Sequence, residues 1–274
     1  MKDPSVLKVA AAQMTSGPDV AVNLAVAGEL AVEAAGSGVG LLVLPENFAF
    51  MGLADADKLA VAELDGEGPI QSWLAETARR LKLWIVAGTI PLRRAGETRV
   101  AAASLLIDAS GARAGRYDKI HLFDVDLPGK RESYRESANI APGSSPSVIE
   151  TPFGKLGLTV CYDVRFPELY RQLSAAGAQL LSVPSAFTAP TGRAHWETLL
   201  RARAIENLCY VIAPAQSGFH ANGRETYGDT MIIDFWGAVL GRRARGRGVV
   251  IAELDLERQA QARASFPALA HRVL

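Results

Sequence analysis

The chain has 274 residues, of which 49% are hydrophobic, and its 29 Lys and Arg residues balance 29 Asp and Glu residues. This length allows a sizeable core in one or two domains, and a net charge of zero argues against nucleic acid or an anionic membrane as the main partner. Asp3 and Pro4 interrupt the apolar core that a signal peptide would need, and no window approaches the ~18 consecutive apolar residues of a membrane span.

Short runs rich in apolar and β-branched residues alternate along the chain with longer helical patterns. Strands are predicted at 7–13, 40–46, 83–90, 103–109, 156–162, 178–184, 209–215, 229–235 and 248–254. Helices are predicted at 21–35, 68–81, 167–176, 194–207 and 255–264, because apolar residues recur there at mixed spacings of three and four. This alternation predicts a layered α/β fold.

The two halves of the chain carry related segments in the same order. IDASGARAGR (107–116) and IDFWGAVLGR (233–242) share the pattern I-D-x-x-G-A-x-x-G-R at an offset of 126, and WIVAG (84–88) and YVIAP (210–214) have the same offset. LLVLPENF (41–48) and LLSVPSAF (180–187) share L-L-x-x-P-x-x-F at an offset of 139. The repeated glycines are typical of tight hairpins. We therefore expect two copies of one strand–helix–strand–hairpin unit, facing each other across one core in a single domain of residues 1–274.

The longest stretch without periodicity is 121–146, HLFDVDLPGKRESYRESANIAPGSSP. Connections of this length inside a compact domain are usually functional or disordered. This one is rich in charged residues and lies between two strand-rich segments, so we expect an active-site loop.

The sequence does not indicate a metal or nucleotide site. It contains no H-E-x-x-H or C-x-x-C motif, and its histidines lie apart at 121, 195, 220 and 271. His195 and Glu197 are two residues apart, so a helix would point them to different faces. GSGVG (36–40) precedes a predicted strand, whereas phosphate-binding glycines follow one, so we interpret it as a helix terminator. We predict neither a metal nor a cofactor.

The two cysteines differ in their surroundings. They cannot form a disulfide framework, and free thiols suit a reducing compartment, so we expect a cytoplasmic protein. Cys209 lies inside the apolar run LCYVIAP and is most simply a core residue. Cys161 ends a predicted strand before a helix with Pro167 in its first turn, where α/β folds place ligands and exposed amides stabilise a thiolate. On these grounds alone, Cys161 is equally well a small apolar plug or a nucleophile.

A nucleophilic thiolate needs a base or a cationic partner. His121 is one candidate, but no third residue is clearly placed to orient it. Glu46 ends the segment LLVLPE, where burial would raise its pKa toward that of a working general base. Lys119 follows the first predicted hairpin and precedes the long loop. Taken singly, Glu46 and Lys119 are also explained as ordinary surface or salt-bridged charges.

Three segments together resemble a known family. LLVLPENF (41–48), GRYDKIHLFD (115–124) and LTVCYDVRFPELYR (158–171), in this order, resemble the signature segments of the nitrilase superfamily of carbon–nitrogen hydrolases, and the resemblance runs over nearly the whole chain. It implies a four-layer αββα sandwich of two pseudo-symmetric halves, in agreement with the internal repeat. It also implies that Glu46, Lys119 and Cys161 form a catalytic triad, with Glu136 in RESANIAPG as the additional glutamate near it.

Within the superfamily, PSAFTAPTGRAHWETLLRARAIEN (184–207) and AQSG (215–218) resemble the branch that acts on deaminated glutathione, and the ω-amidases are similar here. The resemblance implies hydrolysis of a terminal amide of a small carboxylic acid, to acid plus ammonia, through a Cys161 thioester. Glu46 is then the base, while Lys119 and the backbone N–H of Tyr162 stabilise the oxyanion. Glu136 is expected to orient Lys119 or the substrate amide.

Such a substrate presents a carboxylate remote from the scissile amide, and we expect Arg165 to receive it, with Phe187 and Thr191 lining the pocket. Pairing of Arg165 with Asp163 or another acid in a structural bridge is an equal alternative.

Other activities stay open: an ω-amidase acting on α-ketoglutaramate, a nitrilase, an N-carbamoyl-amide hydrolase, or an inactive sandwich that serves as a dimerising partner-binding module. The expected partner is a small-molecule amide, with no nucleic acid and no membrane. The resemblance also implies a homodimer or larger homo-oligomer, paired through helices such as the one containing 201–209.

Overall fold

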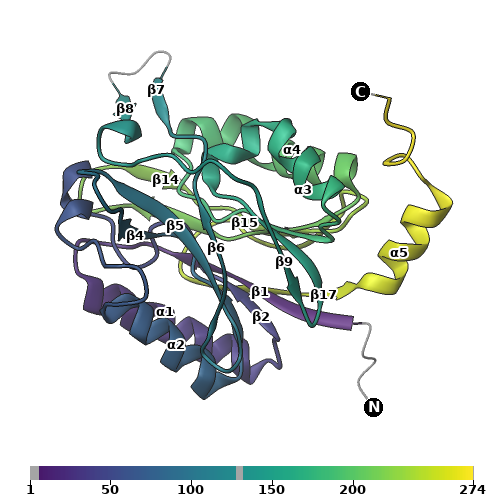
Figure 1. Cartoon of the computed structure of the whole chain (residues 1–274), viewed down its shortest axis with the longest axis horizontal. Helices are drawn as coiled ribbons and strands as arrows, with labels where there is room; N and C mark the ends of the chain where they lie inside the picture. The colour runs from purple at the N-terminus through teal and green to yellow at the C-terminus, as the bar shows by residue number, and fades with distance from the viewer. Residues whose placement is uncertain (1–5, 128–131, 274) are drawn as a thin grey trace.

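The computed structural model describes residues 6–127 and 132–273, and these form a four-layer αββα sandwich. Two β-sheets pack face to face, and a pair of helices covers the outer face of each sheet (Figure 1). Helices α1 (Val20–Gly36) and α2 (Pro69–Leu81) cover one sheet, and α3 (Pro167–Ala175) and α4 (Ala189–Asn207) cover the other. Helix α5 (Leu256–Ser265) lies to one side, near the C-terminus. The predicted fold class is confirmed.

The first sheet is built mainly from the N-terminal half of the chain, and its strand order is β14-β13-β1-β2-β3-β5-β4, with β17 paired to β1 and β6 paired to β5. Its strands are β1 (Val6–Met14), β2 (Leu41–Val43), β3 (Trp84–Val86), β4 (Ile90–Arg93), β5 (Val100–Ile107), β6 (Arg113–Asp118), β13 (Ala215–Phe219), β14 (Glu225–Tyr227) and β17 (Gly248–Asp255). The parallel run β1-β2-β3 lies at its centre, where both faces are buried.

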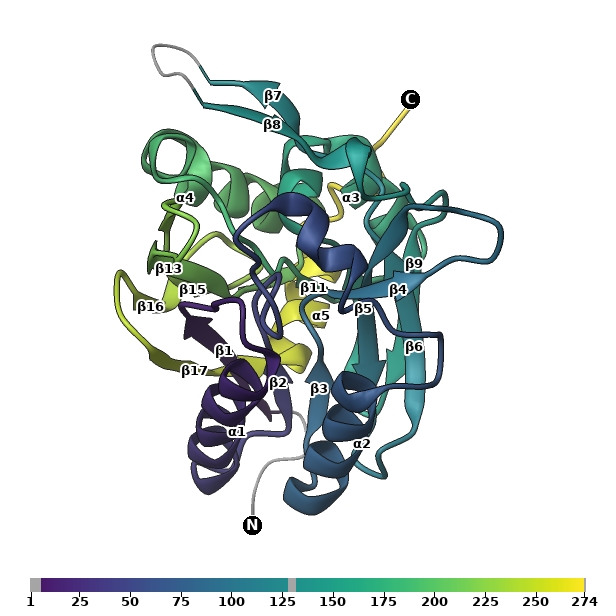
Figure 2. The same cartoon turned by 90° about the vertical axis from the view of Figure 1, so that its left-hand side faces the viewer.

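The second sheet has the strand order β16-β15-β12-β11-β10-β9. Its strands are β9 (Ser147–Thr151), β10 (Gly154–Leu158), β11 (Leu180–Ser182), β12 (Tyr210–Ala213), β15 (Thr230–Ile233) and β16 (Val239–Arg243). The region predicted as a long loop contains the hairpin of β7 (Asp124–Asp126) and β8 (Ser133–Arg135), which projects from one end of the sandwich (Figure 2). The described residues also include three short 3₁₀ helices: η1 (Asp55–Leu59), η2 (Glu136–Ala138) and η3 (Cys161–Arg165).

Side chains of the central strands alternate between two hydrophobic layers, as the period of a β-strand requires. In β1, Val9 and Ala11 join the core between the sheets, whereas Ala10 and Ala12 join the core beneath α1 and α2. The core between the sheets continues through the second sheet to residues of α3 and α4, including Trp196. Burial on both faces explains why these strands are continuous apolar runs rather than alternating ones.

The internal repeat appears in the structure as matched elements. The second-sheet order β11-β12-β15-β16 repeats the first-sheet order β2-β3-β5-β6, and the two hairpins have register shifts at 106/107 and 232/233, which differ by 126. In both turns the aspartate side chain accepts two backbone N–H bonds, Asp108 from Ser110 and Ala112, and Asp234 from Trp236 and Ala238. The glycines that follow, Gly111 and Gly237, have φ values of 87° and 89°, which a side chain disfavours.

The ends of several elements differ from the sequence prediction. The strand predicted at 156–162 ends at Leu158, and helix α4 begins at Ala189 instead of residue 194. Pro190 lies in the first turn of α4, where its missing N–H costs no hydrogen bond, so this segment is helical although it reads as a loop. The strand predicted at 83–90 divides because Gly88, at φ 51°, turns the chain between β3 and β4.

Candidate active site

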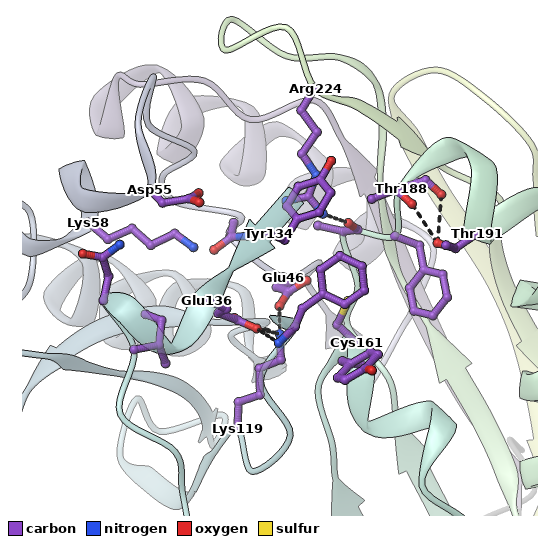
Figure 3. Close-up of a pocket in the computed structure, with 17 residues that line it drawn as sticks. Glu46, Asp55, Lys58, Lys119, Tyr134, Glu136, Cys161, Thr188, Thr191 and Arg224 are labelled. Carbon is purple, nitrogen blue, oxygen red and sulfur yellow. Dashed lines mark hydrogen bonds and ion pairs between the residues drawn. The ribbon is translucent and has the colours of Figure 1, made fainter. Parts of the chain in front are cut away.

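Three segments that follow strands meet at one end of the sandwich. Glu46 lies just after β2, Lys119 follows β6, and Cys161 follows β10 (Figure 3). Gly88 allows the first segment to pack closely, because a Cβ there would lie 1.9 Å from the carbonyl oxygen of Pro45. Gln216 Nε2 donates to the carbonyl oxygen of Glu46 at 3.0 Å and fixes it from β13.

Cys161 stands at the first position of η3 in the left-handed region, with φ 49°. A non-glycine residue pays a conformational penalty there, and such residues concentrate at functional sites. Its N–H donates to the carbonyl oxygen of Pro184 at 2.9 Å, which ties the bend to the segment after β11. The bend therefore presents the thiol to the cavity from a constrained backbone.

Asp163 connects the cysteine bend to the segment that carries Lys119. Its fully buried carboxylate accepts the Val160 N–H at 2.8 Å and the Tyr117 hydroxyl at 2.7 Å through Oδ2. Its Oδ1 accepts the backbone N–H of His121 at 3.1 Å and lies 2.7 Å from His121 Nδ1. Tyr117 and His121 flank Lys119 in sequence, so one carboxylate holds both segments in register. Sequence reasoning missed this role, because the partners of a lone Asp cannot be read from the chain.

The four residues implied by the family resemblance converge. Lys119 Nζ lies 2.8 Å from Glu46 Oε1, and 2.9 and 2.8 Å from the two carboxylate oxygens of Glu136. Glu136 Oε2 also accepts the N–H of Phe123 at 2.7 Å, which fixes the carboxylate against the loop. The Glu46 carboxylate interacts with the Cys161 thiol as well. Glu46, Lys119 and Cys161 are 4%, 2% and 7% exposed, so these interactions operate almost without water.

The protonation states follow from this packing. Burial alone would raise the pKa of Glu46, but the charge and hydrogen bond of Lys119 outweigh burial and hold the pKa below its ordinary 4.5. Burial, and then the Glu46 carboxylate, raise the pKa of the Cys161 thiol, with Lys119 opposing them. Burial alone would lower the pKa of Lys119, but Glu136 and Glu46 keep it well above 10.5. The resting site thus holds a thiol, an ionised Glu46 and an ammonium. The expectation of a raised Glu46 pKa is wrong, because Lys119 outweighs the effect of burial.

A cavity opens in front of the thiol. Tyr162, Phe187 and Thr191, all expected from the sequence, line it together with the four converging residues. The 121–146 stretch contributes Phe123, Tyr134, Glu136, Asn139 and Ile140 to the walls. The sequence-based expectation that this stretch supplies an active-site loop therefore agrees with the lining of the cavity.

Arg165 does not line the cavity and lies behind it. Its guanidinium is 5.2 Å from the centre of the Phe187 ring and 5.8 Å from that of Tyr162. Nη1 lies 3.3 Å from His195 Nδ1, and burial lowers the pKa of Arg165. No described acid pairs with Arg165, and Asp163 bonds elsewhere, so the alternative of an Arg165–Asp163 bridge is wrong.

Several cavity residues were not found from the sequence: Asn47, Asp55, Lys58, Tyr134, Asn139, Ala186, Thr188 and Arg224. They come from the segment after β2, from η1, from the long loop, from the segment between β11 and α4, and from the β13–β14 turn, and none of these carries a periodic pattern. Only the 121–146 stretch gave a signal, through its length and charge.

The other residues considered from the sequence pack against the protein and do not line the cavity. Cys209 is buried and its thiol contacts the carbonyl oxygens of Ala178 and Asn207, as expected of a core residue. His121 stacks on Phe166 with the ring centres 3.7 Å apart. The 36–40 glycines end α1 as expected, since Gly36 is its last residue.

Within residues 6–127 and 132–273, no cluster of three or more His, Cys, Asp or Glu side chains is arranged to hold a metal ion. Within the same ranges, no helix is long and apolar enough to cross a bilayer.

The site contains a thiol beside an ionised carboxylate, and a buried ammonium faces both. This arrangement is typical of hydrolases that use a cysteine nucleophile. A family model described as "Carbon-nitrogen hydrolase" matches residues 8–264 of this chain. The chain is therefore a member of the carbon–nitrogen hydrolase family, within the nitrilase superfamily, as the signature segments implied.

Relatives and solved structures agree with this assignment. The chain is 47% identical over 267 residues to the "Deaminated glutathione amidase" of Synechocystis sp., covering 96% of this chain and 97% of that protein. The crystal structure of the C. elegans NitFhit protein superposes with a TM-score of 0.90 at 39% identity, covering 98% of this chain and 65% of that one. An amidase from Nesterenkonia sp. AN1, with acrylamide added at its active-site cysteine, superposes with a TM-score of 0.79 at 28% identity, covering 95% and 98%.

Proposed function

We propose that this enzyme hydrolyses a linear amide of a small carboxylic acid, of the deaminated glutathione type, through a thioester on Cys161. The observation that carries the proposal is the convergence of Cys161, Glu46, Lys119 and Glu136 in one nearly dry cavity. The similarity to a deaminated glutathione amidase along 96% of the chain supports the substrate class. The acrylamide adduct of the Nesterenkonia amidase supports a reactive thiol in this fold.

In the acylation half, Glu46 accepts the proton of the Cys161 thiol while Sγ attacks the amide carbonyl carbon. The pKa of the resting thiol is raised, so proton transfer accompanies attack instead of preceding it. The C=O π electrons move to oxygen, and Lys119 and the Tyr162 N–H stabilise that oxyanion. Tyr162 lies in the first turn of η3, where N–H groups lack intrahelical acceptors. One such oxyanion donor typically contributes ~3 kcal/mol.

Lys119 gains a free donor at the moment it is needed. An ammonium has three N–H donors, and in the resting site all three are directed to Glu46 and Glu136. Protonation of Glu46 removes its charge and weakens its bond to Lys119, so that donor turns to the developing oxyanion. The total charge of the site and substrate is unchanged by the transfer, because the negative charge that Glu46 loses appears on the substrate oxygen.

Collapse of the tetrahedral intermediate breaks the C–N bond, and Glu46 returns its proton to the leaving nitrogen, which departs as an amine or, from a primary amide, as ammonia. Water then attacks the thioester carbonyl, with Glu46 accepting its proton. Breaking the C–S bond releases the carboxylic acid, and Glu46 passes the proton to Sγ, which restores the thiol. Glu136 keeps Lys119 oriented in both halves, since it retains two oxygens within 2.9 Å of Nζ.

Arg165, Phe187 and Thr191 form our proposed acyl-side pocket. Thr191 and Phe187 line the cavity directly, and Arg165 lies behind the Phe187 ring without an acidic partner among the described residues. A substrate carboxylate that enters between these residues supplies the missing counter-charge. Movement of the Phe187 ring is required for direct contact with the guanidinium.

The test compares Cys161→Ala with Cys209→Ala in an assay of amine and ammonia release. Candidate substrates are deaminated glutathione and α-ketoglutaramate, with simple nitriles and N-carbamoyl compounds beside them. We expect Cys161→Ala to abolish turnover of the amides and Cys209→Ala to retain it. Equal loss in both variants, or full activity of Cys161→Ala, contradicts the nucleophile assignment, and turnover confined to nitriles or N-carbamoyl compounds contradicts the amide class.

We also propose a homodimer or larger homo-oligomer in the cytoplasm. Trp236 and Phe266 are 57% and 53% exposed and pack edge to face at 5.5 Å, and the exposed Ile205 of α4 adjoins Gly237. Such a patch is costly in water and is typical of an interface. Light scattering of the wild type and of Trp236→Glu tests this, because the charge should release monomers. Two free cysteines support a reducing compartment.

A further inference from the structure

Three polar side chains in the cavity have no hydrogen-bond or ion-pair partner among the residues that the structure describes. Lys58, Asn47 and Asn139 all line it, and their side chains make no hydrogen bond or ion pair to any residue of the described ranges. Each is partly buried, so each gives up some of its hydration without compensation from the protein. An ammonium and two amides that converge without partners are the donors expected of a ligand subsite.

Lys58 lies on the wall opposite Thr191 of the proposed acyl-side pocket. In Figure 3, Lys58 approaches from η1 on one side of Cys161, and Thr188 and Thr191 lie on the other side. The two threonine hydroxyls are 2.8 Å apart and satisfy each other, unlike Lys58. The charge of Lys58 reaches the reacting groups, because it contributes to lowering the pKa of Glu46. A substrate bound at Cys161 therefore has Lys58 on the side away from Thr191.

The cavity also adjoins a wider groove at the surface. Asp55, Tyr134 and Arg224 line both the inner cavity and an adjoining surface groove. The inner cavity has a volume of about 50 Å³, whereas the groove has about 560 Å³. Leu53 and Phe219, which are 62% and 74% exposed, form apolar walls of the groove. Ammonia needs no such space, so the geometry suits an amide whose leaving amine carries a substituent.

We propose that Lys58, assisted by Asn47 and Asn139, binds an anionic group on the leaving-amine side of the scissile amide. Lys58 is then the residue that selects amides whose leaving amine carries an acid, and this rests on the proposed amidase function.

Three probes that share the glutaryl acyl group separate anion binding by Lys58 from hydrolysis of the amide. They are N-glutarylglycine, N-glutarylglycinamide and glutaramic acid. Their leaving groups are anionic, neutral and ammonia, respectively. The variants are Lys58→Met, the charge-conserving Lys58→Arg, and Lys155→Met as the matched control. Lys155 pairs with Glu150 on the second sheet and does not line the cavity.

We expect Lys58→Met to lower the kcat/KM ratio of N-glutarylglycine to N-glutarylglycinamide by roughly 10-fold to 100-fold, mainly through KM, as for loss of a charge-assisted hydrogen bond. Lys58→Arg should restore most of the ratio, and Lys155→Met should leave it unchanged. An equal loss for all three probes would show that Lys58 acts only through Glu46 and would overturn the proposal, as would an unchanged ratio.

Binding without turnover distinguishes the two proposals. The Cys161→Ala protein is titrated with N-glutarylglycine by calorimetry, with and without Lys58→Met. Weaker binding in the double variant supports the subsite even if the wild type hydrolyses none of the probes, an outcome that contradicts only the proposed function. Hydrolysis of glutaramic acid by the wild type, with equal binding in both proteins, supports the function and overturns the subsite.

Discussion

Asp163→Asn is the change that most directly tests how the site is assembled. The carboxylate accepts from Val160 N–H and Tyr117 O–H on one oxygen and lies against two nitrogens of His121 on the other. An amide has one oxygen and one NH₂ group, so either orientation turns the NH₂ group toward a backbone N–H. The variant thus leaves one buried donor without an acceptor, whichever way the amide faces.

The magnitude follows from that count. One buried unsatisfied donor costs ~1–3 kcal/mol, and loss of the charge from the remaining bonds adds ~1 kcal/mol, so we expect a destabilisation of about 2–4 kcal/mol. For a chain of this size that lowers Tm by roughly 4–15 °C. Because the same carboxylate aligns the Lys119 and Cys161 segments, kcat should fall by about 10-fold or more.

The assay combines urea unfolding and steady-state kinetics at neutral pH. Asp126→Asn is the control, since Asp126 pairs with Arg135 at the surface and should leave Tm and kcat unchanged. An Asp163→Asn protein with wild-type Tm and kcat would refute the reasoning. A large stability loss with unchanged kcat would show that Asp163 supports the fold but not the alignment of the site.

Three further predictions concern the base, the acyl-side pocket and a turn. Ionised Glu46 stabilises the fold above pH 4.5, because its folded pKa is lowered from that value, and this contribution is lost as the pH falls through the folded pKa. The stability difference between wild type and Glu46→Gln in urea titrations should therefore shrink as the pH falls below 4.5, and a difference that grows contradicts the assignment. Arg165→Lys should raise KM for an acidic amide about 10-fold with less effect on a neutral amide, and equal KM changes contradict the proposed pocket. Gly111→Ala should cost about 2 kcal/mol more in denaturant than Gly223→Ala, since both have positive φ but only a Cβ at Gly111 meets backbone, Ala75 O at 2.5 Å; equal costs contradict this.

Most of the fold could be predicted from the sequence, because it depends on residues that lie close together in the chain. Each helix has an amphipathic or buried apolar pattern, and the Asp–Gly turns at 108–111 and 234–237 use the same side-chain-to-backbone bonds in both halves. The end of β10 could not be predicted from the sequence, because it depends on the hydrogen bond that the Val160 N–H donates to Asp163. That bond is local in the chain, but the burial that strengthens it comes from Tyr117 and His121.

Only part of the candidate site could be predicted from the sequence. Glu46, Lys119, Glu136 and Cys161 lie in recognisable segments, and their convergence needs only that strand ends share one end of the sandwich. The pKa of Glu46 was predicted in the wrong direction, since the sequence indicated burial but not the 2.8 Å bond to Lys119. Lys58 was missed because one lysine in a short 3₁₀ helix has no pattern that marks it. Single-domain behaviour of residues 1–274 stays a prediction.

The central claim is that Cys161 carries the acyl group. The most direct test is to mix the enzyme with a slowly hydrolysed amide, quench with acid within one turnover, digest, and measure peptide masses. We predict that the mass of the acyl group appears on the peptide containing Cys161 and disappears as free acid is released. Acylation of the Cys209 peptide, or full turnover of an enzyme whose Cys161 is blocked by alkylation, would contradict the account.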